Sequence, residues 1–256
     1  MMRRWAVLGA CAGMAGAVVV HAPAVWWSVL LSDATGARVQ LLETRGSLWN
    51  GDGRLRIGRA AQDADARILP GRVSWSWGWD AGAPRVVLRA DCCTPQPVSL
   101  RWEIGWGRLT AHLSDGPSQW PAGLMAAWGA PWNTVQPEGE LRLQTRGMSV
   151  EWSGAGTRVR GELQAEALAV GSRLSTLRPV GSYRLTLSAQ GADAAPTLQL
   201  KTLEGPLQLT GSGQWTGAAW RFRGDAVADP ASEAVLDSLL NLLGQRQGNK
   251  SVLSWG

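Results

Sequence analysis

The feature that most constrains the fold is an alternation of apolar and polar residues with a period of two, which begins near Val39 and recurs along most of the chain. In residues 73–79 a valine and three tryptophans alternate with two serines and a glycine, and residues 98–106 repeat the pattern. Such runs predict strands with one buried and one wet face, which is typical of antiparallel sheets. We therefore expect a mainly β protein with about nine to twelve antiparallel, twisted strands.

Glycine, proline and serine separate these runs. Gly51–Gly53, Gly154–Gly156 and residues 191–193 are expected to form hairpins or tight loops. Residues 115–137 differ, because they hold four prolines and three tryptophans, and their centre, residues 122–128, is expected to form a short helix. Residues 45–51 and 210–217 both combine a Gly-Ser start, one tryptophan and a closing glycine, which favours two related halves joined near 115–137.

The first 31 residues predict a cytoplasmic end and a transmembrane anchor. Met-Met-Arg-Arg precedes Trp5–Val25, an uncharged stretch that is long enough as a helix to cross a hydrocarbon layer of about 30 Å. The two arginines orient its start toward the cytoplasm, and Trp26 and Trp27 suit the outer interface. The alternative is a cleaved signal peptide, since Ala22-Pro23-Ala24 offers small residues at a cleavage site. Either way, residues 32–256 are expected to be one β-rich periplasmic domain of a single-pass protein of the Gram-negative inner membrane.

The end of the chain predicts a short amphipathic helix. Asp229 is a plausible N-cap, Pro230 suits the first helical position, and Gly244 follows a stripe of valine and leucines. The stripe is expected to cover one end of the sheet.

The sequence argues against an enzyme and against a nucleic-acid-binding protein. His112 is the only histidine in the exported part, and no nucleophile elbow, zinc helix or phosphate loop occurs. The net charge of +5 comes from arginines that are scattered at strand positions, without a basic block. We therefore expect no catalytic residue, no metal site and no cofactor.

Cys92 and Cys93 are adjacent. Outside the membrane segment no further cysteine accompanies them, which argues against zinc. In an oxidising periplasm they can form a vicinal disulfide, and buried reduced thiols are the equal alternative.

Two passages and the tail carry a resemblance to a known family. Leu42–Gly51 reads Leu-Glu-Thr-Arg-Gly-Ser-Leu-Trp-Asn-Gly, residues 129–141 read Gly-Ala-Pro-Trp-Asn-Thr-Val-Gln-Pro-Glu-Gly-Glu-Leu, and residues 239–244 with Gly248 form the tail. Together they resemble protein N of the bacterial type II (general) secretion pathway. The residues that carry the resemblance are Gly46, Leu48, Trp49, Gly51, Gly129, Pro131, Asn133, Pro137 and Gly139.

The resemblance implies a non-enzymatic accessory or scaffold component of the inner membrane, which supports the export of folded proteins across the outer membrane. Its partners would be other inner-membrane or periplasmic secretion subunits, and no catalytic residue carries over. A different interpretation remains open, because a long sheet with an apolar face is also similar to AsmA-like periplasmic proteins that hold or transfer lipid in a β-groove.

Overall fold

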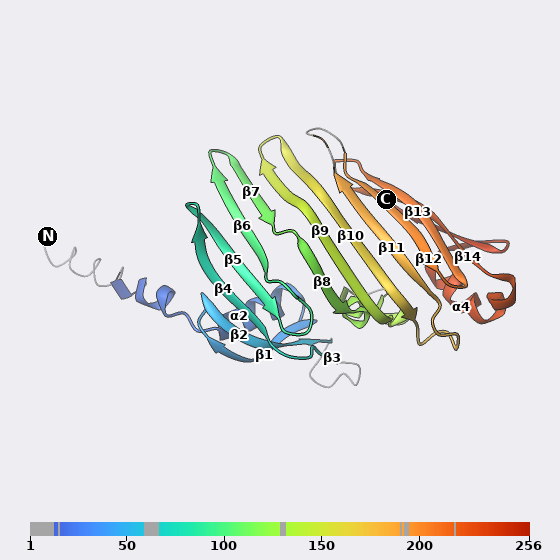
Figure 1. The fold of residues 1–256 in the computed structure, drawn as a ribbon, viewed down its shortest axis with the longest axis horizontal. Coiled ribbons are helices and arrows are strands. Elements are labelled where there is room, and N and C mark those ends of the chain that lie inside the picture. The colour runs from blue at the N-terminus through green and yellow to red at the C-terminus, as the bar shows by residue number, and fades with distance from the viewer. Residues whose placement is uncertain are drawn as a thin grey trace, which may run out of the picture. The chain divides into compact units, whose positions relative to one another are not determined.

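The computed structural model describes residues 13–14, 16–58, 67–128, 132–189, 191, 195–217 and 219–256. The chain divides into two compact units, Met1–Trp77 and Gly78–Gly256. Each unit is built on antiparallel strands, so the prediction of a mainly β, antiparallel protein with a short C-terminal helix is confirmed (Figure 1). The predicted relation between two halves stays a prediction.

The first unit contains the helix α2 and a small sheet, and the described residues 16–20 before α2 are helical as well. Its strand order is β1-β2-β4, and β3 pairs with β2. β1 contains a bulge between Leu42 and Arg45, where Glu43 adopts a positive φ of 50°. The elements are α2 (Val25–Ala34), β1 (Val39–Gly46), β2 (Asn50–Ile57), β3 (Arg67–Ile68) and β4 (Val73–Asp80), whose last three residues belong to the second unit.

The transmembrane helix stays a prediction. The expected span, Trp5–Val25, begins among residues 1–12, which lie outside the described residues. Among the residues that are described, no helix is long and apolar enough to cross a membrane.

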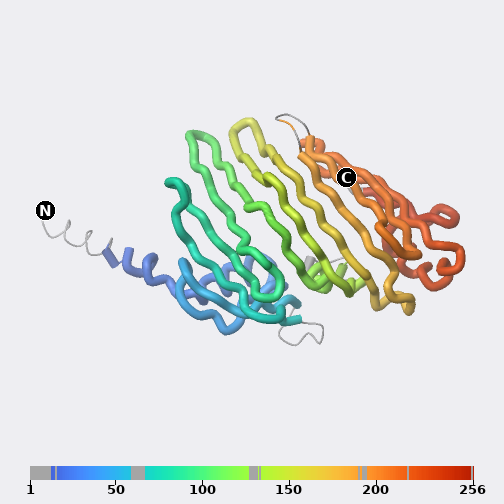
Figure 2. The backbone as a smooth tube through the Cα atoms, viewed as in Figure 1, coloured from blue at the N-terminus to red at the C-terminus, as the bar shows by residue number. Residues whose placement is uncertain are grey.

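The second unit is a long antiparallel meander with helical segments (Figure 2). Its strand order is β5-β6-β7-β9-β10-β11-β12-β13-β14-β16-β15, and β8 pairs with β9. The strands are β5 (Ala83–Ala90), β6 (Val98–Gly105), β7 (Arg108–Leu113), β8 (Gly116–Pro121), β9 (Glu138–Ser153), β10 (Gly156–Gly171), β11 (Gly181–Ala189), β12 (Thr197–Glu204), β13 (Leu207–Trp215), β14 (Trp220–Ala228), β15 (Gln245–Gln247) and β16 (Lys250–Trp255). The helical segments are η1 (Ala122–Trp128), α3 (Trp132–Val135), η2 (Pro230–Ser232) and α4 (Glu233–Leu243).

The hydrophobic core of the second unit lies between α4 and the apolar face of the last strands. α4 contacts β14 and β16 and buries Leu236, Leu239 and Leu240, as its leucine stripe predicts. The other buried members of the core are Val135, Val180, Leu207, Phe222, Ala226, Ala228 and Leu253. α4 thus covers one part of the apolar face of the sheet, and the rest of that face lies outside the contact with α4.

Two local expectations were wrong and one was incomplete. Gly51–Gly53 is not a hairpin but part of β2, because the chain has already turned at residues 47–49. Residues 122–128 are helical as expected, in the 3₁₀ form. The described residues form sixteen strands rather than nine to twelve. Two of the additional strands, β3 and β15, are too short for an alternating pattern to reveal them.

Candidate functional site

The first motif that carries the family resemblance, Gly46–Gly51, forms the turn between β1 and β2. Gly46 has a φ of +86°, and a Cβ there would clash with the carbonyl of Asn50. A Cβ on Gly51 would lie 2.5 Å from the carbonyl oxygen of Arg45 and 2.8 Å from Cζ2 of Trp75. Both positions therefore require glycine, one for its backbone conformation and both for close packing. Leu48 and Trp49 lie in this turn.

Three indoles hold the turn through their N–H groups. Nε1 of Trp75, a buried side chain, donates to the carbonyl oxygens of Ser47 (3.2 Å) and Leu48 (3.1 Å). Nε1 of Trp27 donates to the Leu48 carbonyl as well, at 2.9 Å. Nε1 of Trp49 donates outward to the carbonyl of Val19, at 2.8 Å. The turn's carbonyls thus have donors that a phenylalanine could not supply.

The segment before α2 is bound to the same turn. The backbone N–H of Ala24 donates to the Gly46 carbonyl at 3.2 Å, and the N–H of Leu48 donates to the Ala22 carbonyl at 2.8 Å. Ala22 and Ala24 are only 1% and 2% exposed. The two small residues of the candidate cleavage site are therefore part of the packing of the first unit.

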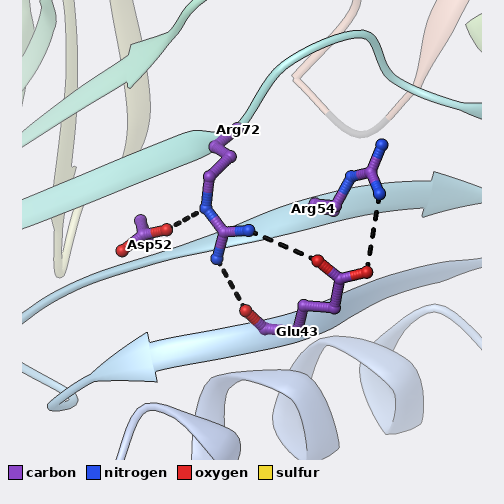
Figure 3. Close-up of polar contacts among 4 residues, drawn as sticks. All are labelled: Glu43, Asp52, Arg54 and Arg72. Atoms are coloured by element: carbon purple, nitrogen blue, oxygen red, sulfur yellow. Dashed lines mark hydrogen bonds and ion pairs between the residues drawn. The ribbon is translucent and has the colours of Figure 1, made fainter.

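An arginine cluster braces the bulge of β1 (Figure 3). Arg72 forms an ion pair with Asp52 and donates from Nη2 to the backbone carbonyl of Glu43 at 2.6 Å. The Glu43 carboxylate also lies 3.5 Å from Arg72 and 3.5 Å from Arg54. Because these side chains are between 26% and 58% exposed, the charge pairs stabilise little. The hydrogen bond to the backbone carbonyl of Glu43, a residue with positive φ, is the specific contact. No spacing pattern among these residues predicts the cluster.

The second motif packs inside the second unit. Val135 and Pro137 are buried, and the Val135 carbonyl accepts a hydrogen bond of 2.7 Å from Oγ of Ser172. Gly139 has a φ of +117°, and a Cβ there would lie 2.5 Å from the Leu168 carbonyl oxygen. Gly129, Pro131 and the side chain of Asn133 lie outside what the structure describes. The placed residues of this motif thus serve the core.

Cys92 and Cys93 are joined by a disulfide in the turn between β5 and β6. Cys93 is buried, and Cys92 is exposed. The N–H of Cys93 donates to the Ala90 carbonyl at 2.9 Å, and the Cys93 carbonyl accepts from Gln119 of β8 at 2.7 Å. The bridge fixes a turn to which a neighbouring strand is attached.

Among the residues that the structure describes, the polar side chains around His112 form no catalytic arrangement. Nε2 of His112 lies 3.4 Å from the Glu103 carboxylate, a pair on adjacent strands, and Glu103 also contacts Arg101 at 2.5 Å. Among the described residues no group of three or more His, Cys, Asp or Glu side chains could hold a metal ion.

An apolar groove lies on the sheet of the second unit. Its volume is about 360 Å³, and it is lined by Leu163, Ala165, Leu185, Leu187, Leu198, Trp220 and Phe222. These residues come from β10, β11, β12 and β14, and Phe222 is shared with the hydrophobic core. The groove is therefore an uncovered continuation of the face that α4 covers. The strand alternation predicts this apolar face but not the part of it that stays open.

Comparison with known proteins gives one match. The family model described as "Type II secretion system (T2SS), protein N" matches residues 37–252. No curated protein and no solved structure matches the chain significantly.

Proposed function

Since the chain belongs to the family of type II secretion system protein N, we propose that it is a non-enzymatic scaffold of that system, held at the inner membrane by its N-terminal segment. The family match makes it a component of the secretion system. In the proposed role, the N-terminus lies in the cytoplasm, the β units lie in the periplasm, and they contact other secretion subunits during the export of folded proteins.

The observation that carries this proposal is the attachment of Ala22 and Ala24 to the turn of residues 46–51. Cleavage after Ala24 would remove the Ala24 N–H, which donates to the Gly46 carbonyl. It would also remove the Ala22 carbonyl, which accepts from the Leu48 N–H. It would also remove two side chains that are almost fully buried. A fold that uses these residues favours retention of the N-terminal segment, and a retained apolar segment fixes the sheet beside the membrane.

The mass of the mature protein tests the retained anchor. Purified from membranes, the chain should keep residues 1–24, and a tag at its start should resist protease added to spheroplasts while the remainder is digested. A mature chain that begins at Val25 and appears in the periplasmic fraction would refute the anchor.

Co-purification tests the scaffold. A tagged full-length chain, solubilised in mild detergent, should retain other inner-membrane secretion subunits, and deletion of the gene should reduce secretion without loss of the secreted proteins inside the cell. The proposal fails if secretion depends on the chain but no secretion subunit is retained, even after cross-linking.

The apolar groove favours a second candidate function, the holding of a lipid along the sheet. Its seven lining residues are all apolar, and apolar grooves of this volume suit hydrocarbon better than a polar ligand. Phospholipid should then be found by native mass spectrometry in the purified full-length chain. Leu187→Gln, inside the groove, should reduce it, while Leu203→Gln, an exposed position outside the groove, should not. Equal lipid in both variants would argue against the groove.

A further inference from the structure

Exposed tryptophans gather at one end of the second unit. The turns that follow β4, β6 and β9 all lie at the same end, because each of these strands runs in the same direction in the antiparallel meander (Figure 1). Trp79 precedes the first turn, Trp106 lies in the second, and Trp152 precedes the third. Their exposed fractions are 78%, 105% and 42%.

The strand register joins two of these turns into one apolar cluster. Ile104 of β6 pairs with Leu109 of β7, and Leu109 pairs with Trp152 of β9. Directly paired residues point to the same face of a sheet, so the three side chains form a row across three strands. Trp106 stands beside this row, in the turn between β6 and β7. We call Ile104, Trp106, Leu109 and Trp152 the turn-end cluster.

The exposure of this cluster is not explained by the fold of the chain. Ile104 is 76% exposed, and Trp106 has no neighbour that covers it. Gly105 and Gly107 flank Trp106, and a Cβ on Gly107 would meet nothing within 4 Å, so the indole projects from a narrow turn. Contiguous exposed apolar side chains of this size mark a surface that contacts a protein partner or a membrane.

The chemistry of the cluster fits a lipid interface better than a protein groove. Indoles prefer the headgroup level of a bilayer, where the ring is in an apolar layer and the N–H stays wet. Indoles at several turns of one end can reach a single planar surface, whereas a protein partner would need a separate pocket for each.

The charge beside the cluster supports the same partner. The acidic residues near this end are paired with arginines, namely Asp80 with Arg85, Glu103 with Arg101 and Glu151 with Arg158. Arg108 lies two residues from Trp106, and among the ion pairs of the described residues none involves it. Its positive charge suits the phosphate of an anionic headgroup.

We propose that the turn-end cluster inserts into the headgroup region of a phospholipid bilayer, giving the second unit a membrane contact of its own. The contact does not depend on whether the N-terminal segment is retained. It would hold the end of the sheet that carries the turns after β4, β6 and β9 against a lipid surface.

A fluorescent reporter in the full-length chain tests this contact. Ala155, exposed in the turn after β9, is changed to cysteine and labelled with an environment-sensitive dye, in a Cys11→Ser background; Cys92 and Cys93 are already bonded to each other. The protein is held in nanodiscs of phosphatidylethanolamine and phosphatidylglycerol, and vesicles of the same lipids are added. A spin-labelled quencher lipid is placed either in the disc or in the vesicles. Quenching in the first arm reports the bilayer that holds the N-terminal segment, and quenching in the second reports a separate bilayer.

We expect quenching in one of the two arms. Ile104→Ser with Trp106→Ser should weaken it, with about a tenfold loss of vesicle affinity if the second arm is the one that responds. The matched control, Leu203→Ser with Val235→Ser, removes two side chains that are 39% and 42% exposed elsewhere and should leave quenching unchanged. The proposal is overturned if neither arm quenches, if the Ile104/Trp106 variant quenches like the control, or if the reporter responds only to added secretion subunits.

Discussion

Substitution of Gly51 by alanine is the sharpest test of how the first motif works. The added methyl would lie 2.5 Å from the Arg45 carbonyl oxygen, 2.8 Å from the Trp75 ring and 3.0 Å from the Ser47 carbonyl oxygen. Two of these three neighbours are backbone oxygens, one in β1 and one in the turn, so relief requires movement of β1 against β2. Overpacking of this kind costs about 1–3 kcal/mol, and we expect a loss near the middle of that range, about 2 kcal/mol.

Gly53→Ala is the matched control in the same strand. A Cβ there would lie 3.3 Å from the Leu42 carbonyl oxygen and 3.3 Å from Cγ2 of Thr44, so small adjustments suffice. The gain from a less flexible unfolded chain then offsets most of the cost.

Urea unfolding of the full-length protein in detergent, followed by tryptophan fluorescence, measures the difference. With a slope of about 1 kcal/mol per molar for a unit of this size, Gly51→Ala should lower the midpoint by about 2 M. Equal midpoints for the two variants would refute the packing argument. If Gly51→Ala stopped secretion without changing stability, the motif would be a binding site instead.

Three further predictions concern the second unit. Leu240→Ala should destabilise it by about 2–5 kcal/mol, because Leu240 lies on the side of α4 that is fully buried in the core. The exposed Val235→Ala, on the same helix, should change stability by less than about 0.5 kcal/mol in the same urea titration. Burial raises the pKa of the Tyr183 hydroxyl, so above about pH 10 the folded state keeps a proton that the unfolded state releases. The free energy of unfolding should therefore fall by about 1.4 kcal/mol per pH unit in that range. Tyr183→Phe should abolish this slope. Reduction of Cys92–Cys93 should lower stability by about 1 kcal/mol or less, since a bridge between neighbours restricts little chain entropy, and a large fall in Tm would contradict that account.

Much of the fold follows from the alternation of apolar residues. Burial of one face of each strand is a local demand, so residues 73–79 and 98–106 reveal their strands without reference to the rest of the chain. The leucine stripe of α4 could be predicted in the same way, because its spacing matches one face of a helix. β9 and β10 were harder, since each continues for sixteen residues through glycines that normally end a strand. Gly147 and Gly161 lie where the register between them shifts.

The sites depend on contacts between distant residues, and these were not predictable. The donation from Trp75 to Leu48 joins residues 27 positions apart, and the Arg72 contact with Glu43 joins residues 29 positions apart. Neither pair has a characteristic spacing, because its geometry depends on the register of β2 against β4. The turn-end cluster could have been suspected from a tryptophan between two glycines, but only the strand register places Ile104, Leu109 and Trp152 in one row.

The unusual composition then has a physical reason. The chain holds 16 tryptophans but one tyrosine and one phenylalanine. In the turn of residues 46–51, Trp75 must fill space and also donate sideways to two carbonyls, which phenylalanine cannot do and tyrosine does only from the tip of its ring. At the proposed lipid contact, Trp106 needs a large apolar ring with a group that stays hydrated. Both demands select the indole. Trp75→Phe should therefore weaken the turn of the first unit, whereas Trp106→Phe, which keeps the ring at an exposed position, should leave folding intact and reduce only the lipid contact. If Trp106→Phe unfolded the second unit, the tryptophan in this turn would have a structural role and the argument for the interface would lose its basis.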